Sequence, residues 1–233
     1  MAPPSPGQNQ LLAALPPDVQ LRVFNQLQHN SFSIGERLLG PGERVPKVYF
    51  PTDSIVALVS TTTSGDSAEV AIVGNEGIVG VAAFLGGGST LGHAVVQSTG
   101  SAFSMRTKQF LSEFNRHEAL HRLVLLYCQA LLTQIAQTAV CSRHHSIEER
   151  LCRWLLLSLD RLPSNELAIT QELIASMLGV RREGVTEAAG KLQRLGIIEY
   201  SRGRIHVKNR QELERITCGC YRLVKTETER LLS

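Results

Sequence analysis

The sequence predicts an α+β protein, with a compact β-domain followed by a long helix and a C-terminal winged helix-turn-helix. Three observations carry this prediction. Short β-rich runs alternate with Gly and Pro turns from about residue 32 to residue 105. Apolar residues then recur at helical spacing over residues 117–142. Finally, residues 169–207 combine the spacing of a helix-turn-helix with that of a β-hairpin.

Length and composition set the class. A chain of 233 residues with 43% hydrophobic and 19% charged residues can form two small globular domains. The net charge is only +3, so an argument for nucleic-acid binding depends on where the charges lie. The chain has no run of 18 apolar residues and no secretion signal, which predicts a cytoplasmic protein outside the membrane. It also lacks a nucleophile elbow, a metal triad and paired carboxylates, so we do not expect an enzyme.

The N-terminal region is predicted to be mostly β-structure. We expect no regular structure over residues 1–10 and one short helix after Pro16. The clearest strand candidates are residues 47–50, 55–59, 69–73 and 94–96. Gly-rich turns lie between them, and this pattern is typical of a compact barrel, roll or sandwich.

The long helix carries a seam of residues spaced alternately by four and three positions. This seam predicts pairing with another helix, so we assign it to a dimer interface. Its members are Val124, Cys128, Leu131, Ile135 and Thr138. Leu120, Tyr127 and Leu132 lie off the seam, so the β-domain and a second subunit would each cover one side. The alternative is a helix buried wholly within one chain.

The helix-turn-helix is predicted from four positions. Thr170 is a good N-cap for its first helix. Ala175 lets the two helices cross closely, Gly179 makes the turn, and Val185 fills the angle between them. The recognition helix should run over residues 182–195, and a hairpin with a basic tip, the wing, over residues 197–207.

The charges of this region suit DNA. Arg182 can read guanine and Glu183 can accept from cytosine. Arg181, Lys191, Arg202 and Arg204 are expected on phosphates. The alternative is a helical hairpin with a solvated basic face. The predicted DNA-contacting residues are Thr170, Gln171, Arg181, Arg182, Glu183, Thr186, Glu187, Lys191, Arg202 and Arg204.

Three parts of the chain follow from these patterns. A β-domain is expected over residues 11–116, a dimerisation helix over 117–145, and the DNA-binding domain over 146–233. Ser146 and Glu149 form a capping box that opens the last part. Residues 211–233 are predicted to form one further helix that stabilises the dimer or caps the domain.

The cysteines do not predict a metal site or disulfides. An odd count of five argues against a disulfide framework. Cys218-Gly219-Cys220 stands isolated from other ligand candidates in the sequence. We therefore expect reduced thiols packed as small hydrophobes, and no metal.

The sequence resembles the Crp-Fnr family of transcription regulators over nearly its whole length. Two segments carry the resemblance: residues 169–183 in the DNA-binding domain and the run Gly74-Asn75-Glu76-Gly77-Ile78-Val79-Gly80 in the β-domain. The resemblance implies a β-roll (a double-stranded β-helix) like a cyclic-nucleotide-binding domain. It also implies a homodimer on a palindromic operator, allosteric control by an effector, and RNA polymerase as a partner.

Two sites, the ligand pocket and the recognition helix, depart from the family pattern. Members that bind cyclic AMP hold the ribose with a Glu and the phosphate with an Arg-Ser pair, and the matching residues here are Val81, Gly92 and His93. This possible ligand pocket therefore should not take cyclic AMP in the usual mode. The loop of residues 86–88 is either an anion-binding nest or a plain Gly-rich turn. In the recognition helix, Glu187 stands where many relatives have Arg.

Other effectors and other roles for the β-domain stay open. An iron–sulfur centre of the Fnr type is not expected, because the first cysteine of the chain is Cys128. Haem or another small effector is not excluded, and His93, His117 and His121 are candidate axial ligands. Alternatively, the β-domain is a protein-interaction module that takes no small ligand.

Overall fold

The computed structural model describes residues 4–232. The chain begins with η1 (Pro6–Gln8), α1 (Gln10–Ala13) and α2 (Pro17–Phe24). The helix after Pro16 is confirmed, but the prediction of an unstructured start is wrong from Pro6 onward. Asn9 is fully buried, and its amide donates to the carbonyls of Pro51 and Gly77, both at 2.9 Å. Residues 1–3 lie outside the described part of the chain.

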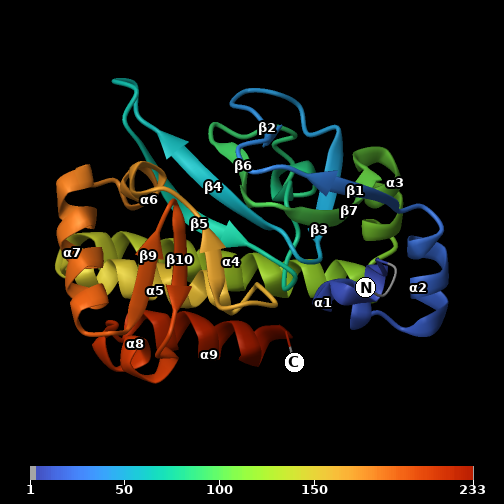
Figure 1. The fold of residues 1–233 in the computed structure, drawn as a ribbon. Helices are drawn as coiled ribbons and strands as arrows, with labels where there is room; N and C mark the ends of the chain where they lie inside the picture. The colour runs from blue at the N-terminus through green and yellow to red at the C-terminus, as the bar shows by residue number, and fades with distance from the viewer. Residues whose placement is uncertain (1–3, 233) are drawn as a thin grey trace.

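Two antiparallel sheets form the β-roll (Figure 1). The first sheet has the order β1 (Gln28–Phe32), β7 (Gly100–Arg106), β3 (Lys47–Pro51). The second has the order β2 (Arg37–Leu39), β6 (His93–Ser98), β4 (Ile55–Thr61), β5 (Ser67–Val73). The strands expected over residues 47–50, 55–59, 69–73 and 94–96 are all present. β1 starts before the predicted β-region, because Gln28-His29-Asn30-Ser31 is a polar, mostly exposed edge strand without an apolar signature.

Helices α3 (Thr107–Phe114) and α4 (Ala119–His144) follow the roll. By length and composition α4 is the one described helix that could cross a membrane. It lies instead along the roll, with Val124 and Leu131 buried in the core that the roll forms with α1–α3.

The orientation of α4 corrects the predicted dimer seam. Val124 and Leu131 are 0% and 5% exposed, and Cys128 and Ile135 pack against the same core. The chain itself already covers Val124 and Leu131, which leave no surface for a second subunit, whereas Cys128, Ile135 and Thr138 are half-buried. A parallel stripe lies one position further along the helix and faces outward. Its members are Leu125, Gln129, Leu132, Ala136 and Ala139.

The C-terminal half forms a second core. It contains α5 (Ile147–Leu159), β8 (Glu166–Ala168), α6 (Gln171–Leu178), α7 (Arg182–Arg194), β9 (Ile198–Ser201) and β10 (Arg204–Val207). The predicted capping box opens α5: Ser146 Oγ accepts from Glu149 N at 3.3 Å, and Glu149 Oε2 accepts from Ser146 N at 2.9 Å. β8 adds a third strand to the β9–β10 hairpin.

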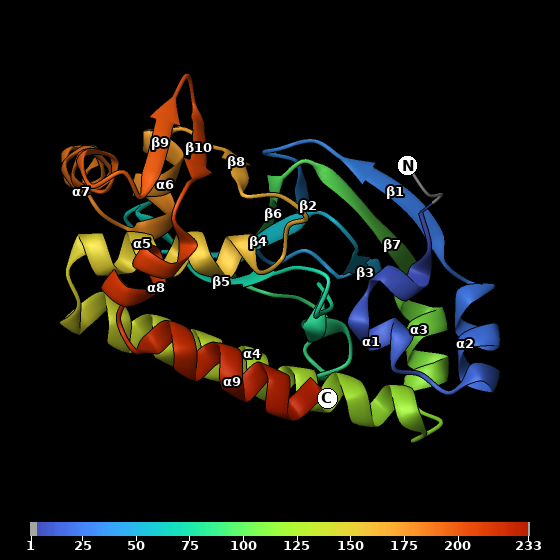
Figure 2. The same ribbon diagram turned by 60° about the horizontal axis from the view of Figure 1, so that its bottom comes forward.

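The C-terminus holds two helices rather than the single one predicted. α8 (Arg210–Ile216) ends where Thr217 takes an extended conformation, and α9 (Cys220–Leu232) starts again after Gly219. The break turns the chain back, so α9 lies along α4 (Figure 2).

The roll and the C-terminal half are packed together. Arg161, just after α5, forms a buried ion pair with Glu76, with Nη2 2.8 Å from Oε1. A side chain at Gly74 would collide with Arg161, and one at Gly77 would collide with Tyr127 of α4. Met177 of α6 packs against Ala57 and Val59 of β4. The Gly74–Gly77 loop is therefore shaped to fit against α4 and the C-terminal half.

Candidate nucleic-acid interface

Helices α6 and α7 form the predicted helix-turn-helix. Thr170 caps α6, and its hydroxyl accepts from Leu173 N at 3.2 Å. Gly179 ends α6 with φ 62° and ψ 42°, a left-handed conformation that only Gly adopts cheaply. Val185 is 0% and Ala175 4% exposed, as expected where two helices cross closely. The apolar side of the motif therefore fixes the angle at which α7 projects.

The outer face of α7 is exposed and polar. The predicted N-terminus is correct, since Arg181 is the N-cap and Arg182 the first helical residue. Arg182, Glu183, Thr186 and Glu187 all face solvent. Together with Gln171 at the start of α6, they line one shallow hollow of the surface. Five of the predicted contact residues therefore lie side by side.

Hydrogen bonds order this face. The Thr186 hydroxyl donates to Gln171 Oε1 at 2.7 Å and thereby links the two helices. Arg182 Nε lies 3.9 Å from Glu172 Oε2 in an exposed pair, which is worth little in water and leaves the guanidinium free to turn toward a base.

The wing is the tight hairpin that the sequence predicts. Arg202 and Gly203 form its tip with φ of 50° and 76°, as in a two-residue turn with both central residues at positive φ. The Arg202 side chain is exposed. Arg204 instead pairs with Glu166 of β8, with Nη1 2.7 Å from Oε1. The tip therefore offers one unpaired cation, while Arg204 is shared with the neighbouring strand.

Two carboxylates near this surface were missed by the sequence analysis. Besides Glu166, Glu148 of α5 holds Lys191, with Nζ 2.6 Å from Oε2. Neither acid shows a signal in the sequence, because each partner lies on a different element. Their effect is to lower the positive potential at Lys191 and Arg204, two of the four residues predicted to contact phosphate.

The predicted ligand-pocket residues lie at one cavity. A space of about 210 Å³ between the roll and α4 is lined by Val81, Gly92 and His93, together with Leu131 and Ile135 of α4. Its other lining residues are apolar or glycine except Ser60 and Thr90, and no Lys, Arg, Asp or Glu is among them. The cavity therefore lacks the cation that a phosphate diester requires.

Gly92 explains why a larger side chain is missing there. A Cβ at this position would lie 2.7 Å from the carbonyl oxygen of Val59. An Arg in the usual family position would need the backbone to move. In the Gly-rich loop, Gly88 N already donates to Ala82 O at 2.9 Å, which ties part of a potential anion nest into the fold.

The other candidate haem ligands do not reach this cavity. His117, just before α4, and His121, in its first turn, pack edge to face with ring centroids 4.6 Å apart, and neither lines the cavity. Only His93 of the three candidates does so.

Comparison with known proteins gives matches in both halves. The family model described as a cyclic nucleotide-binding domain matches residues 29–117, and that of a Crp-like helix-turn-helix domain matches residues 149–216. The chain is 27% identical over 197 residues to the global nitrogen regulator of Synechococcus elongatus, covering 78% of this chain and 86% of that protein.

Solved structures show the same fold at low identity. FixK2 from Bradyrhizobium japonicum superposes with a TM-score of 0.69 at 19% identity, covering 83% of this chain and 98% of that one. A transcriptional regulator of the Crp/Fnr family from Eubacterium rectale gives a TM-score of 0.68 at 15% identity, covering 88% and 96%. The roll, the long helix and the C-terminal helix-turn-helix are thus the elements of one shared architecture.

Proposed function

Because this chain belongs to the Crp-Fnr family of DNA-binding transcription regulators, we propose that it binds a palindromic operator as a homodimer, with α7 in the major groove. The single observation that carries the proposal is the exposed polar face at the start of α7. Arg182, Glu183 and Thr186 project there from a helix whose opposite side is locked by Val185. This is the end of a recognition helix that contacts base edges.

Base and backbone contacts are assigned by side-chain chemistry. Arg182 reads guanine O6 and N7, and Glu183 accepts from cytosine N4. Arg181 and Arg202 contact phosphates and position the protein without specifying sequence. Glu187 turns toward the bases or away from the DNA, because backbone phosphates would repel its charge.

The exposed stripe on α4 supports the homodimer. Leu132 is 67% and Leu125 43% exposed, although both are large apolar residues on a long helix. Spacings of four and three along the stripe suit pairing with the same helix of a second copy. Two recognition helices then meet half-sites about 34–36 Å apart on one face of the duplex.

We place the effector in the cavity under the roll. Leu131 and Ile135, which line that cavity, directly precede Leu132 and Ala136 of the exposed stripe on the neighbouring face of α4, so a ligand there would press directly on the dimer helix. An uncharged, largely apolar molecule suits the lining better than a cyclic nucleotide. Such a ligand shifts the spacing of the two α7 helices by binding one dimer geometry better than the other.

The remaining assignments follow from a regulator of this kind. It acts in the cytoplasm, contacts RNA polymerase and has no enzymatic activity. The alternative, a roll that serves only as a protein-interaction module, predicts that no metabolite raises the melting temperature. A small molecule that raises it would support the effector site.

The test is selection of DNA from a random duplex pool at fixed salt. A two-fold symmetric motif is expected. Arg182→Ala should then lose about 1–3 kcal/mol on that motif and accept other bases at one position per half-site. Arg215→Ala, an exposed change on α8, is the matched control. Selection of a non-symmetric motif, or a motif unchanged by Arg182→Ala, would contradict the proposal.

A further inference from the structure

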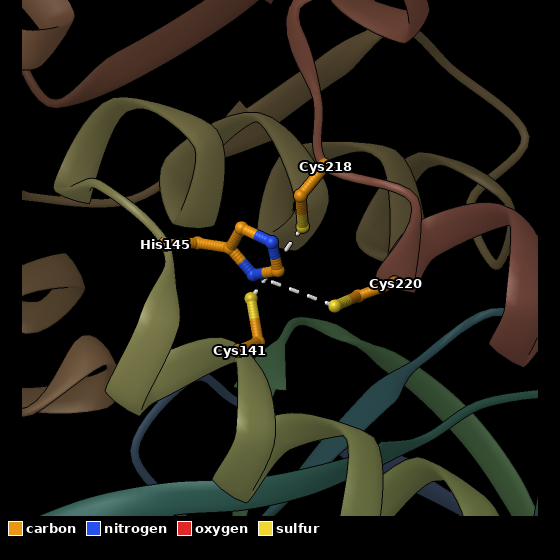
Figure 3. Close-up of side chains that lie close together, drawn as sticks. All are labelled: Cys141, His145, Cys218 and Cys220. Carbon is orange, nitrogen blue, oxygen red and sulfur yellow. Dashed lines mark hydrogen bonds between the residues drawn. The ribbon is translucent and has the colours of Figure 1, made fainter.

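Four potential metal ligands meet where α4 ends and α9 begins. Cys141 lies in the last turn of α4, and His145 follows that helix as its C-cap. Cys218 precedes α9, and Cys220 is its first residue. Figure 3 shows the three sulfur atoms and the imidazole ring pointing toward one another from these two segments. The fold thus gathers residues that the sequence analysis expected to pack only as small hydrophobes.

The distances suit a single ion. The four ligand atoms all lie within 4.8 Å of one another. Cys141 Sγ is 3.6 Å from Cys218 Sγ, and Cys220 Sγ is 3.6 Å from His145 Nδ1. Zinc bonds of about 2.3 Å to sulfur and 2.0–2.1 Å to nitrogen put the corners of a Cys₃His tetrahedron about 3.5–3.8 Å apart. An iron–sulfur cluster needs wider spacing, because its cysteines bind different irons.

The surroundings suit a closed site. All three cysteines are buried, and all are free thiols. Gln137 Nε2 donates to Cys220 Sγ at 3.1 Å, a contact that favours a thiolate and orients it. His145 is half-buried, and a set of four protein ligands with three buried thiols is typical of structural rather than catalytic zinc.

Positive charge is available to balance the site. Three thiolates and one imidazole around Zn²⁺ carry a net charge of −1. Arg153 of α5 carries a positive charge and is only 7% exposed. Its guanidinium donates to Thr138 Oγ1 at 2.8 Å, which holds it against the end of α4. A buried cation at this end of α4 can offset the net negative charge of the site.

We propose that Cys141, His145, Cys218 and Cys220 bind one zinc ion that joins the two ends of segment 146–217 to the end of α4. His145 directly precedes Ser146, the N-cap of α5, and Cys218 follows α8. The segment 146–217, which contains the helix-turn-helix and the wing, therefore leaves and returns to the same point. The ion holds the two ends of segment 146–217 together at the end of α4. Because α9 packs along α4, the ion also fixes the orientation of the recognition helix α7 relative to α4.

Metal analysis of the full-length protein tests this site. After expression with added zinc and dialysis under reducing conditions, wild type should hold one zinc per chain. Cys141→Ser and the double variant Cys218→Ser/Cys220→Ser should hold none. Cys128→Ser is the matched control, since it changes a half-buried cysteine of α4 outside the cluster, and should keep the zinc. His145→Cys should also keep it, because a thiolate replaces the imidazole.

Cobalt provides a readout that does not depend on variants that fold poorly. Apo wild type titrated with Co²⁺ should develop thiolate charge-transfer bands and the strong visible bands of a tetrahedral complex, saturating at one ion per chain. Weak octahedral bands, or no saturable binding, would overturn the proposal. So would wild type without zinc, zinc retained by Cys141→Ser, or iron with inorganic sulfide on these cysteines.

These outcomes are separate from those of the proposed function. Zinc content and cobalt spectra are measured without DNA. A protein free of metal that still selects a palindrome would overturn the zinc site alone. A protein with one zinc that selects no motif would leave the site standing and contradict operator binding.

Discussion

The C-terminal domain and the β-roll differ in how much binding chemistry their side chains present. The hollow at the start of α7 is lined by Gln171, Arg182, Glu183, Thr186 and Glu187, all polar. The cavity under the roll has only Ser60, Thr90 and His93 as polar side chains in its lining. Both regions keep a well-packed core, so packing alone does not separate them. The difference teaches that a fold is specified by many apolar positions, whereas ligand chemistry depends on a few polar ones.

The two regions nevertheless remain mechanically joined. Glu76 and Arg161 bridge them in a buried pair, and α6 packs on the β4–β5 hairpin. A ligand bound in the roll can therefore still act on the helix-turn-helix, even though the cavity does not suit a cyclic nucleotide. The following changes test that junction first and then each region separately.

The largest expected effect is at the buried pair. Arg161→Met leaves the Glu76 carboxylate buried with only Gly74 N–H as a donor, at 3.2 Å from Oε2. Removing one partner of such a pair costs about 3–5 kcal/mol. Urea unfolding at pH 7 measures this loss. The double variant Glu76→Gln/Arg161→Met should recover much of it, because no unpaired charge remains.

An exposed pair provides the matched control for that change. Arg204→Met breaks the pair with Glu166 and should cost less than about 1 kcal/mol. If Arg161→Met and Arg204→Met lose the same free energy of unfolding, the buried pair stabilises the protein no more than an exposed one.

The second prediction concerns the roll. Gly92→Ala places a Cβ 2.7 Å from the Val59 carbonyl, so the backbone must shift. Overpacking of this kind costs about 1–3 kcal/mol. Gly87→Ala is the control, since its Cβ would make only an ordinary contact at 3.6 Å. If both variants melt at the wild-type temperature, space at Gly92 is not what excludes the arginine of cyclic-AMP-binding relatives.

The same contrast explains what the sequence could predict. Thr170, Gly179 and Val185 act within one short segment, so their spacing alone predicted the helix-turn-helix and its boundaries. α4 was harder, because Val124 and Leu125 are both apolar and only the position of the roll decides which one is buried. The zinc ligands lie at the opposite ends of segment 146–217. Their proximity depends on the break at Thr217 and on α9 folding back along α4, and neither has a local signal.

The third prediction is a pH dependence at the junction. Glu69 of β5 faces α5, and its Oε2 is buried without a hydrogen-bond partner among the described residues. Burial raises the pKa of Glu69 to about 8, with Trp154, Arg153 and Arg161 opposing the shift. The folded protein therefore keeps a proton that the unfolded chain releases near pH 4.5, so this contribution to stability is lost as the pH rises toward 8.

Glu69→Gln removes the fall in the free energy of unfolding that ionisation of Glu69 causes as the pH rises. Relative to wild type, its free energy of unfolding should improve between pH 5 and pH 8, by on the order of 1 kcal/mol once partial exposure is allowed for. Urea titrations at both pH values measure it. Asp66→Asn takes an exposed carboxylate from the tip of the same hairpin and serves as the matched control. An identical change in the two variants would rule out a specific role for burial at Glu69.

The smallest effect is expected on the DNA-binding side, at Lys191. Its ammonium lies 2.6 Å from Glu148 Oε2, so an approaching phosphate must compete with a carboxylate. Glu148→Gln removes the competing charge. Because an exposed pair is worth about 0.2–1 kcal/mol, affinity at low salt should rise only a few-fold.

Salt dependence decides whether that gain comes from a phosphate contact. If Lys191 gains a phosphate in Glu148→Gln, the slope of log K against log salt should steepen by up to about 0.9, the value for one added contact on duplex DNA. Adding Lys191→Ala should abolish the gain. Glu212→Gln, which releases Arg215 on the exposed side of α8, controls for the change in net charge. If both variants tighten binding equally, the gain reflects overall charge, and Lys191 does not reach the DNA backbone.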